Sequence, residues 1–206
     1  MHYRSEWGWK STLFSLLCGI HRPDSGRVFL KGEDVTRLLA FQRVRRGIGL
    51  TFQTNRAFHR LSVRQNLSAV LQISRADRPA DADERYRFAL DRFGLDADSE
   101  MPAKELPHHR LQWLEIAMVL AAGPDIVLLD EPTAGMSTDE TLQTGAVLKH
   151  LNSSGLTIVV VEHDVAFVRD VAQRITVVHQ GRVFAEGSVD EITEHADVRR
   201  IYLGQA

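Results

Sequence analysis

Two adjacent carboxylates directly follow an apolar run in the segment Asp125-Ile-Val-Leu-Leu-Asp130-Glu131-Pro132. An unbroken apolar run predicts a strand that is buried on both faces, as in a parallel α/β sheet. Carboxylates at the C-terminal end of such a strand lie where open α/β sheets bind ligands. The pair therefore indicates Mg²⁺ coordination by Asp130 and orientation or deprotonation of a water by Glu131. A strand end with a solvated acidic turn is the alternative.

A second candidate for chemistry is Lys10-Ser11-Thr12, which precedes the helical pattern Leu13–Ile20. The lysine would reach the β- and γ-phosphates of a nucleotide, and the hydroxyl of Ser11 would ligate Mg²⁺ at a helix N-terminus that favours anions. The full phosphate-loop pattern G-x-x-x-x-G-K-[ST] needs glycines where this chain has Arg4 and Trp9. Each non-glycine residue forced left-handed costs roughly 1–2 kcal/mol, so the loop as written predicts weak nucleotide binding.

The genetic code supplies a hypothesis for residues 1–9. Tryptophan has one codon, so Trp7-Gly8 and Trp9-Lys10 both give glycine when they are read one base later. One permitted DNA string then reads Cys-Thr-Ile-Gly-Pro-Asn-Gly-Ala-Gly-Lys, a complete phosphate loop, and loss of one A beside the Lys10 codon would change the frame. We therefore expect residues 1–9 to be an out-of-frame remnant. An upstream DNA frame without those glycines would contradict this hypothesis.

The elements that must position these groups alternate between strands and helices. Apolar runs predict parallel core strands at Ile126–Leu129, Thr157–Val161 and Ile175–Val178, separated by helical patterns at Glu140–Leu151 and Val165–Gln173. This alternation predicts an α/β core. Further strands are expected at Arg27–Leu30 and Gly47–Thr51, a hairpin at Ile175–His179 and Val183–Glu186, and charged helices at Asp83–Phe93 and Leu111–Ala121.

Length and composition predict one domain. With 206 residues and 44% hydrophobic residues, the chain can bury a core, and residues 1–62 and 121–206 would form the α/β core around a helical subdomain at about 63–120. The net charge of −2 argues against a nucleic-acid partner. The single cysteine, Cys18, excludes an internal disulfide framework and suits a reducing compartment. No apolar stretch approaches the roughly 20 residues of a membrane span, and we expect a cytoplasmic protein.

From Lys10 to the C-terminus, these motifs and their spacing resemble the nucleotide-binding subunit of an ABC transporter. The resemblance implies a P-loop NTPase core with an inserted α-helical subdomain and with its N-terminal strands missing. In Leu50-Thr-Phe-Gln53, Gln53 matches the Q-loop glutamine, which implies contact with Mg²⁺ and water. In Glu162-His163-Asp164, His163 matches the switch histidine, which implies a γ-phosphate contact.

The resemblance also implies a set of functional residues. Glu131 and His163 would be catalytic. Residues expected to bind ATP are Gly8, Lys10, Ser11, Thr12, Gln53 and His109, and those expected to organise Mg²⁺ are Ser11, Gln53 and Asp130. The implied assembly is a dimer of two such ATPase subunits on transmembrane permease subunits, at the inner face of the cell membrane.

One group within the family is more similar than the rest. Ala134-Gly-Met, Val161-Glu-His-Asp and Val183-Phe-Ala-Glu-Gly are similar to the ATPases of branched-chain amino acid and urea importers. In that group a periplasmic binding protein delivers the solute, so such a protein is an indirect partner. The sequence does not determine the solute, because the binding protein and the permease select it.

The signature segment departs from the family pattern. Leu106-Pro107-His108-His109-Arg110 stands where L-S-G-G-Q is expected, and it would donate N–H groups to ATP held by the partner subunit. His109 replaces a glycine that lets the backbone approach phosphate. His108 and His109 as metal ligands are a weaker alternative, because adjacent helical residues do not face the same way.

Two other functions remain open at this stage. A catalytically impaired or truncated ABC-fold binding or regulatory subunit is favoured by Trp9 and His109. A soluble ABC-fold ATPase acting on DNA or ribosomes is disfavoured by the charge balance and by the lack of a coiled-coil insertion.

Overall fold

The chain forms an α/β fold around a parallel sheet. The computed structural model describes residues 8–51, 56–72, 79–97 and 99–202, and the side chains of all of these except residues 8–11 and 202. Three strands pair in the order β3-β4-β5, where β3 is Ile48–Leu50, β4 is Ile126–Asp130 and β5 is Thr157–Val161. Both ladders are parallel, and they confirm the expected strands at these positions.

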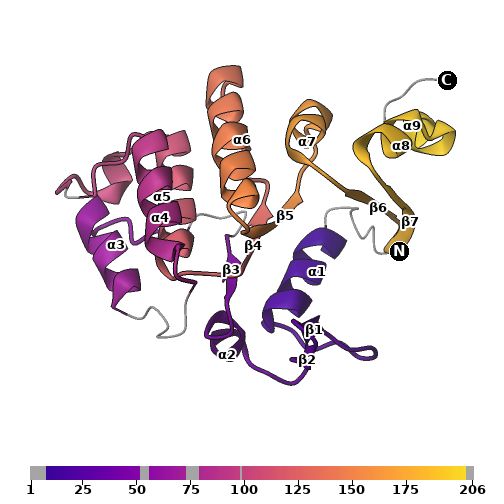
Figure 1. The fold of residues 1–206 in the computed structure, drawn as a ribbon, viewed down its shortest axis with the longest axis horizontal. Helices are drawn as coiled ribbons and strands as arrows, with labels where there is room; N and C mark the ends of the chain where they lie inside the picture. The colour runs from indigo at the N-terminus through magenta and orange to yellow at the C-terminus, as the bar shows by residue number, and fades with distance from the viewer. Residues whose placement is uncertain (1–7, 52–55, 73–78, 98, 203–206) are drawn as a thin grey trace, which may run out of the picture.

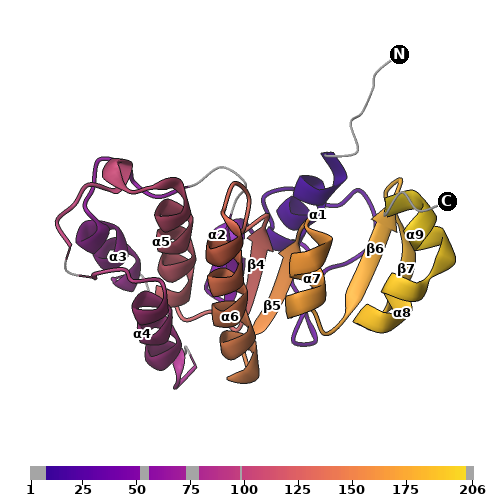
Figure 2. The same ribbon diagram turned by 90° about the horizontal axis from the view of Figure 1, so that it is seen from above.

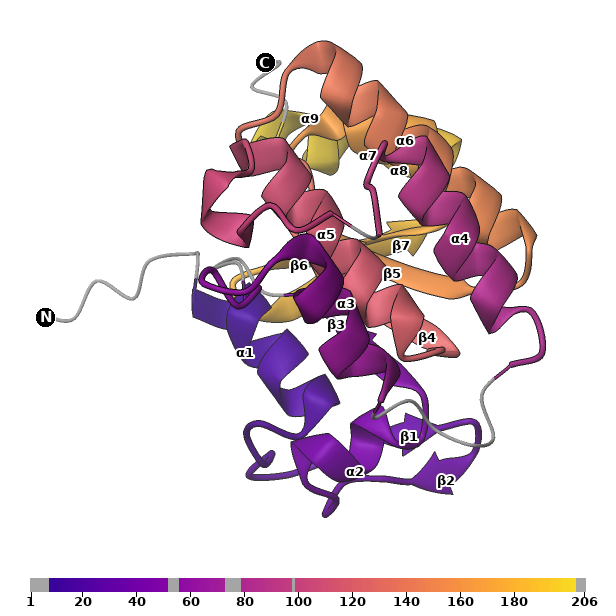
Figure 3. The same ribbon diagram turned by 90° about the vertical axis from the view of Figure 1, so that its left-hand side faces the viewer.

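The apolar run of β4 is buried because the strand meets a different cluster of side chains on each face. Val127 and Leu129 belong to the larger hydrophobic core, and Leu128 between them belongs to the smaller one. Successive strand residues point to opposite faces, so a strand covered on both sides needs apolar residues at every position. Figures 1 and 3 show these coverings: α6 (Thr138–Ser153) and α7 (Val165–Val171) lie on one side, and α1 (Gly8–Cys18) and α2 (Ala40–Val44) on the other.

Three helices stand together beside the sheet, at the left of Figures 1 and 2. They are α3 (Val63–Leu71), α4 (Ala82–Arg92) and α5 (His108–Ala121), and a short 3₁₀ turn, η1 (Ala103–Glu105), precedes α5. The larger core joins these helices to β4 and α6. The predicted division of the chain near residues 63 and 120 stays a prediction, because one apolar cluster continues across it.

The N-terminal elements are closed by a buried arginine. The smaller core joins α1 to the hairpin of β1 (Phe29–Leu30) and β2 (Glu33–Asp34). Arg43 of α2 is 0% exposed, and its guanidinium donates to the carbonyls of Leu16 and Leu17 at 2.6 and 2.7 Å. These carbonyls lie at the C-terminal end of α1, where helical carbonyls lack intrahelical donors. Burial raises the pKa of the neighbouring Cys18 thiol to about 12.

The first strand of the C-terminal hairpin does not join the parallel sheet as expected. β6 (Ile175–His179) was predicted to be a third parallel core strand, but it pairs antiparallel with β7 (Arg182–Gly187). Among the described residues no ladder joins β6 to β5. The connecting residues Gln180 and Gly181 have φ of 49° and 74°, which are the left-handed values that a tight hairpin turn needs. The local turn therefore sets the neighbour of β6, and Figure 2 shows β6 and β7 standing beside α8 (Val189–Glu194) and α9 (Ala196–Tyr202).

The remaining sequence predictions mostly agree with these elements. Four predicted helices correspond to α4, α5, α6 and α7, and the expected C-terminal hairpin corresponds to β6 and β7. The first predicted helix begins earlier than expected, at Gly8. The sequence analysis did not predict α2, α3, α8 or α9. In the described part of the chain, no helix is both long and apolar enough to cross a bilayer.

Candidate active site

Glu131 and His163 meet at the C-terminal ends of two neighbouring strands. β4 and β5 run parallel with Asp130 opposite Val161, so the residues that follow each strand are at the same edge of the sheet. The Nε2 atom of His163 lies 2.6 Å from Oε1 of Glu131. The side chain of Glu131 is 13% exposed and that of His163 is 43% exposed. A nearly enclosed carboxylate can orient a water molecule or accept its proton, and an accessible imidazole beside it can donate a hydrogen bond to a bound anion.

The backbone at Glu131 is strained. Its φ is 49°, in the left-handed region that non-glycine residues rarely adopt. The Glu131 N–H donates to the carbonyl of Val161 at 2.9 Å, which holds this residue to the end of β5. Strain of this kind costs on the order of 1–3 kcal/mol and collects at functional sites. The conformation turns the chain sharply at the end of β4.

Glu162 ties the two loops together, a role that the sequence analysis missed. Its Oε1 atom accepts hydrogen bonds from the backbone N–H of Thr133 at 3.1 Å and from the Thr133 hydroxyl at 2.6 Å. Its Oε2 atom accepts from the N–H of His163 at 3.0 Å. Asp164 caps α7 by accepting from Ala166 and Phe167. The acidic residues on both sides of His163 could have suggested this, because a histidine held in one position needs structural partners.

Asp130 faces the side of the sheet that carries α1. Residues two apart on a strand share a face, and Leu128 packs in the cluster that contains Phe14 of α1. Asp130 therefore lies on the same face as the helix that begins with the predicted phosphate-binding residues. The Asp130 carboxylate supplies oxygen ligands, which suit a hard cation such as Mg²⁺.

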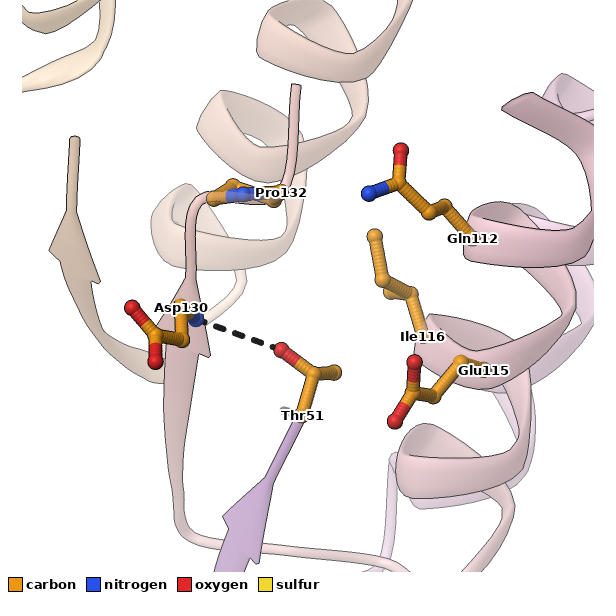
Figure 4. A pocket seen from close by; sticks show the side chains of 6 residues that line it. All are labelled: Thr51, Gln112, Glu115, Ile116, Asp130 and Pro132. Carbon is orange, nitrogen blue, oxygen red and sulfur yellow. Dashed lines mark hydrogen bonds between the residues drawn. The ribbon is translucent and has the colours of Figure 1, made fainter. Parts of the chain in front are cut away.

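On the other side of the Asp130 backbone lies a small hollow. It is lined by Thr51, Gln112, Glu115, Ile116, Asp130 and Pro132. Figure 4 shows the Asp130 N–H directed to the Thr51 hydroxyl at 3.3 Å, with the Asp130 carboxylate pointing away from Glu115. This hollow lies between α5 and β4, and the Asp130 carboxylate points away from it, toward the α1 side of the sheet.

The predicted nucleotide residues are described only in part. α1 begins at Gly8, so Lys10 and Ser11 lie in its first turn, but their side chains lie outside the described residues. Thr12 is exposed in the same helix. Gln53 lies outside the described residues, as do residues 1–7, so the hypothesis of an out-of-frame remnant stays a prediction.

The signature-position histidines point to different partners. The Nε2 atom of His108 lies 3.2 Å from the carbonyl oxygen of Ala134, and Nδ1 of His109 lies 2.7 Å from Oε1 of Glu140. The structure thus places both residues against the chain that follows Glu131. Among the described residues, no group of three or more His, Cys, Asp or Glu side chains is arranged to hold a metal ion.

Known proteins match this chain over most of its length. Residues 9–134 match the ABC transporter family. The chain is 35% identical over 197 residues to the lipopolysaccharide export system ATP-binding protein LptB of Escherichia coli K12, covering 95% of this chain and 81% of that protein. It is 34% identical over 196 residues to a "Probable ABC transporter ATP-binding protein" of Azorhizobium caulinodans, covering 95% of this chain and 69% of that protein.

Solved structures agree with these matches. The fold matches the ADP conformation of an ATP-binding cassette of an ABC transporter with a TM-score of 0.79 and 24% identity, over 95% of this chain and 84% of that one. A dimeric cassette in a post-hydrolysis state, bound to ADP and Pi, matches with a TM-score of 0.74 and 26% identity, over 87% of this chain and 80% of that one. Members of the matched family bind ATP with Mg²⁺, hydrolyse it, dimerise and work with transmembrane permease components. The chain belongs to the ATP-binding subunits of ABC transporters.

Proposed function

We propose that this chain hydrolyses ATP to drive transport, with Glu131 and His163 as its catalytic residues. The observation that carries the proposal is their contact of 2.6 Å at the ends of adjacent parallel strands. Glu131 would orient the attacking water or accept its proton, and His163 would steady the γ-phosphate. The strained backbone at Glu131 supports a role in catalysis, because strained conformations persist mainly where function requires them.

The phosphates and Mg²⁺ would bind between α1 and the end of β4. Gly8, Lys10, Ser11 and Thr12 would hold the phosphates, since an anion is favoured at a helix N-terminus. Ser11, Gln53 and Asp130 would hold Mg²⁺, which offsets phosphate charge when it is bound. The position of Asp130 on the α1 face of the sheet supports this assignment.

A second copy or a related subunit would complete each site. The segment Leu106–Arg110, which contains His109, would face ATP held by the partner. Two observations support this role: α5 begins after Pro107 without a side-chain hydrogen bond that caps its N–H groups, and a relative of similar fold was solved as a dimer with ADP and Pi. The N–H groups at the start of α5 are therefore available to an anion.

The permease would contact a surface made by two loops near α3. Backbone hydrogen bonds join the loops, from Val63 N–H to Met101 O at 3.1 Å and from Ala103 N–H to Leu61 O at 2.9 Å. Phe58 on one loop is 55% exposed, and Met101 on the other is 47% exposed. Exposed apolar side chains on neighbouring loops fit a protein contact. Through it the chain would lie at the inner face of the membrane, without a nucleic-acid partner.

The transport substrate we favour is a branched-chain amino acid, urea or a similar small solute delivered by a periplasmic binding protein. The support is sequence similarity: Ala134-Gly-Met and Val161-Glu-His-Asp are similar to the ATPases of branched-chain amino acid and urea importers. Lipopolysaccharide export is the second candidate, because relatives at 35% identity carry that name. Reconstitution with the permease subunits that co-purify with this chain separates the two, since ATPase activity should rise with the solute and its binding protein for import, and with lipopolysaccharide for export.

The first experiment measures nucleotide binding and hydrolysis by the full chain. A binder gains thermal stability from Mg²⁺-ATP by mass action. Glu131→Gln should keep this gain but lose hydrolysis by on the order of 100-fold, because general acid–base groups contribute about that much. Glu194→Gln, an exposed glutamate in α8, is the control and should hydrolyse ATP normally. Absence of any nucleotide-dependent stabilisation would favour the non-catalytic regulatory subunit instead.

A further inference from the structure

Two neighbouring histidines at the start of α5 hold two different parts of the chain that follows Glu131. Successive helical residues point about 100° apart, so His108 and His109 cannot share a partner. His108 contacts Ala134, three residues after Glu131, and His109 contacts Glu140 in the first turn of α6. The family pattern has a glycine at position 109, so the His109 contact belongs to this sequence and not to the pattern.

The His109 contact is embedded in packed side chains. Its ring meets Trp113 edge-on with 4.9 Å between centroids, and Trp113 donates its indole N–H to the hydroxyl of Thr144 at 2.9 Å. Trp113 and Thr144 are 4% and 0% exposed. Glu140 also accepts from the backbone N–H of Ser137 at 2.7 Å, in the capping box of α6. These contacts hold the His109 side chain in one rotamer.

The His108 contact reaches the loop itself. A carbonyl oxygen only accepts, so Nε2 of His108 must carry the proton that it donates to Ala134. The neighbouring Gly135 has φ of 72°, and a Cβ added there would lie 3.4 Å from Cδ2 of the His108 ring. The N–H of Ala134 in turn donates to the carbonyl of Glu131 at 3.1 Å. The imidazole is thus one hydrogen-bonded step from the backbone of Glu131.

The loop from Glu131 to Ser137 and the first turn of α6 that follows it are held from two sides. On the β5 side, Glu162 accepts a hydrogen bond from Thr133. On the α5 side, His108 contacts Ala134 and His109 contacts Glu140. We propose that His108 and His109 are positioning residues for hydrolysis, whose imidazole N–H groups make the loop after Glu131 and the start of α5 move together. This inference rests on the proposed function. There the start of α5 faces the partner's nucleotide, and Glu131 acts on the nucleotide bound by its own subunit.

The consequence is a direct link between two sites. If α5 shifts when its N-terminus meets the partner's nucleotide, the two histidines transmit the shift to the loop that starts at Glu131. A misplacement of about 1 Å can cost up to 10²-fold in rate, so a small transmitted movement matters. Binding of ATP by Lys10 and the α1 N-terminus does not depend on the histidines.

Isosteric amides provide the critical variants. The side-chain nitrogen of asparagine can replace Nδ1 of a histidine, and that of glutamine can replace Nε2. His108→Gln and His109→Asn therefore keep one donor each, and His108→Ala and His109→Ala remove it. His150→Ala is the matched control, because His150 lies at the far end of α6 and stacks on Phe88.

The first readout is amide hydrogen exchange of residues 133–137 in the full chain without nucleotide. We expect about tenfold faster exchange in the alanine variants, near wild-type exchange in the amide variants, and no change in the control, since local opening sets exchange rates. Equal exchange in the wild type and both alanine variants would overturn the proposal, whether or not the chain hydrolyses ATP.

The second readout separates positioning from a general loss of structure. The alanine variants should lower kcat for ATP hydrolysis by about tenfold, because the loop acts on the chemical step. KM for ATP should stay within twofold of wild type, because the backbone N–H groups that would face the partner's ATP remain in both variants. The amide variants should restore kcat. Failure of His108→Gln and His109→Asn to restore either kcat or loop protection would refute the role of the N–H donors. A wild type without ATPase activity would refute the proposed function alone, and exchange would still decide the coupling.

Discussion

Two polar networks in this molecule use hydrogen bonds in opposite ways. The guanidinium of Arg43 is fully buried and donates to the carbonyls of Leu16, Leu17, Thr36 and Leu38 at 2.6–3.3 Å. The carboxylate of Glu131 lies at a strained backbone position and contacts a histidine that is 43% exposed. One network is closed and unstrained, and the other is open and strained.

The difference follows from what each network must do. Buried carbonyls at the end of α1 need donors, and a fully buried guanidinium that donates to four carbonyls is not accessible to a ligand. Glu131 and His163 keep one face for solvent and substrate, and strained, open sites cost stability that the rest of the fold supplies. Arg43 should therefore be important for stability and Glu131 for activity.

The largest expected effect comes from breaking the closed network. Arg43→Met keeps much of the side-chain volume but leaves buried carbonyls without donors. We expect the free energy of unfolding to fall by about 3–5 kcal/mol, since each unsatisfied buried group costs about 1–3 kcal/mol. Urea unfolding followed by circular dichroism measures the loss.

The matched control is Arg46→Met, the same substitution three residues further on. The side chain of Arg46 is 38% exposed and contacts the exposed Glu33 at 3.1 Å, and ion pairs open to solvent contribute at most about 1 kcal/mol. Equal losses in the two variants would contradict the structural role assigned to Arg43.

The open network could be predicted from sequence, and the closed one could not. Asp130 and Glu131 directly follow an apolar run, and His163 follows the next run, so parallel pairing alone brings them together. Arg43 gives no such signal, because an arginine in a short charged segment is usually solvated. Its burial depends on the end of α1, which lies more than twenty residues earlier in the sequence.

Other errors have the same origin. The strand at Ile175–His179 and its hairpin were predicted correctly, but the parallel core pairing also expected for this strand is wrong, because a two-residue turn pairs it with β7. The role of Glu162 depends on a hydroxyl 29 residues away in the sequence, at Thr133. Local patterns thus predict elements and motif positions, and long-range contacts decide how those positions are supported.

The next effect tests the open network through its exposed member. His163→Ala should lower ATP hydrolysis by on the order of 100-fold, because it removes the group that we propose steadies the γ-phosphate. The free energy of unfolding should change by less than about 1 kcal/mol, because the side chain removed is itself 43% exposed. His21→Ala, an exposed histidine elsewhere, serves as the control for both measurements. A large loss of stability with normal hydrolysis would reverse the assignment of this network.

A smaller effect measures the strain at Glu131. Glycine adopts a φ of 49° without steric cost, and alanine does not. The free energy of unfolding of Glu131→Gly should therefore be about 1 kcal/mol higher than that of Glu131→Ala. At most positions the glycine variant is the less stable of the two. Both variants lose the contact to His163, so the comparison isolates the backbone. A more stable alanine variant would show that the loop relaxes when the side chain is removed.

The smallest effect concerns Glu140, which stabilises the helix that follows the strained loop. Hydrogen bonds from the backbone N–H and hydroxyl of Ser137, with the nearby His109, hold the pKa of Glu140 below its usual value of 4.5. Because the folded pKa is the lower one, this contribution to stability is present above about pH 4.5 and disappears as pH falls through the folded pKa.

Urea unfolding of the wild type and Glu140→Gln from pH 7 to pH 3 tests this dependence. The advantage of the wild type should be constant at neutral pH and shrink in acid, since only the carboxylate accepts all of these bonds. Glu191→Gln removes the equivalent carboxylate in the capping box of Ser188 at α8, where the pKa is also lowered. Its advantage should shrink in the same direction. If the stability difference between the wild type and Glu140→Gln grew in acid, the Glu140 carboxylate would be destabilising the folded chain. The start of α6, next to the open network, would then have no stabilising cap.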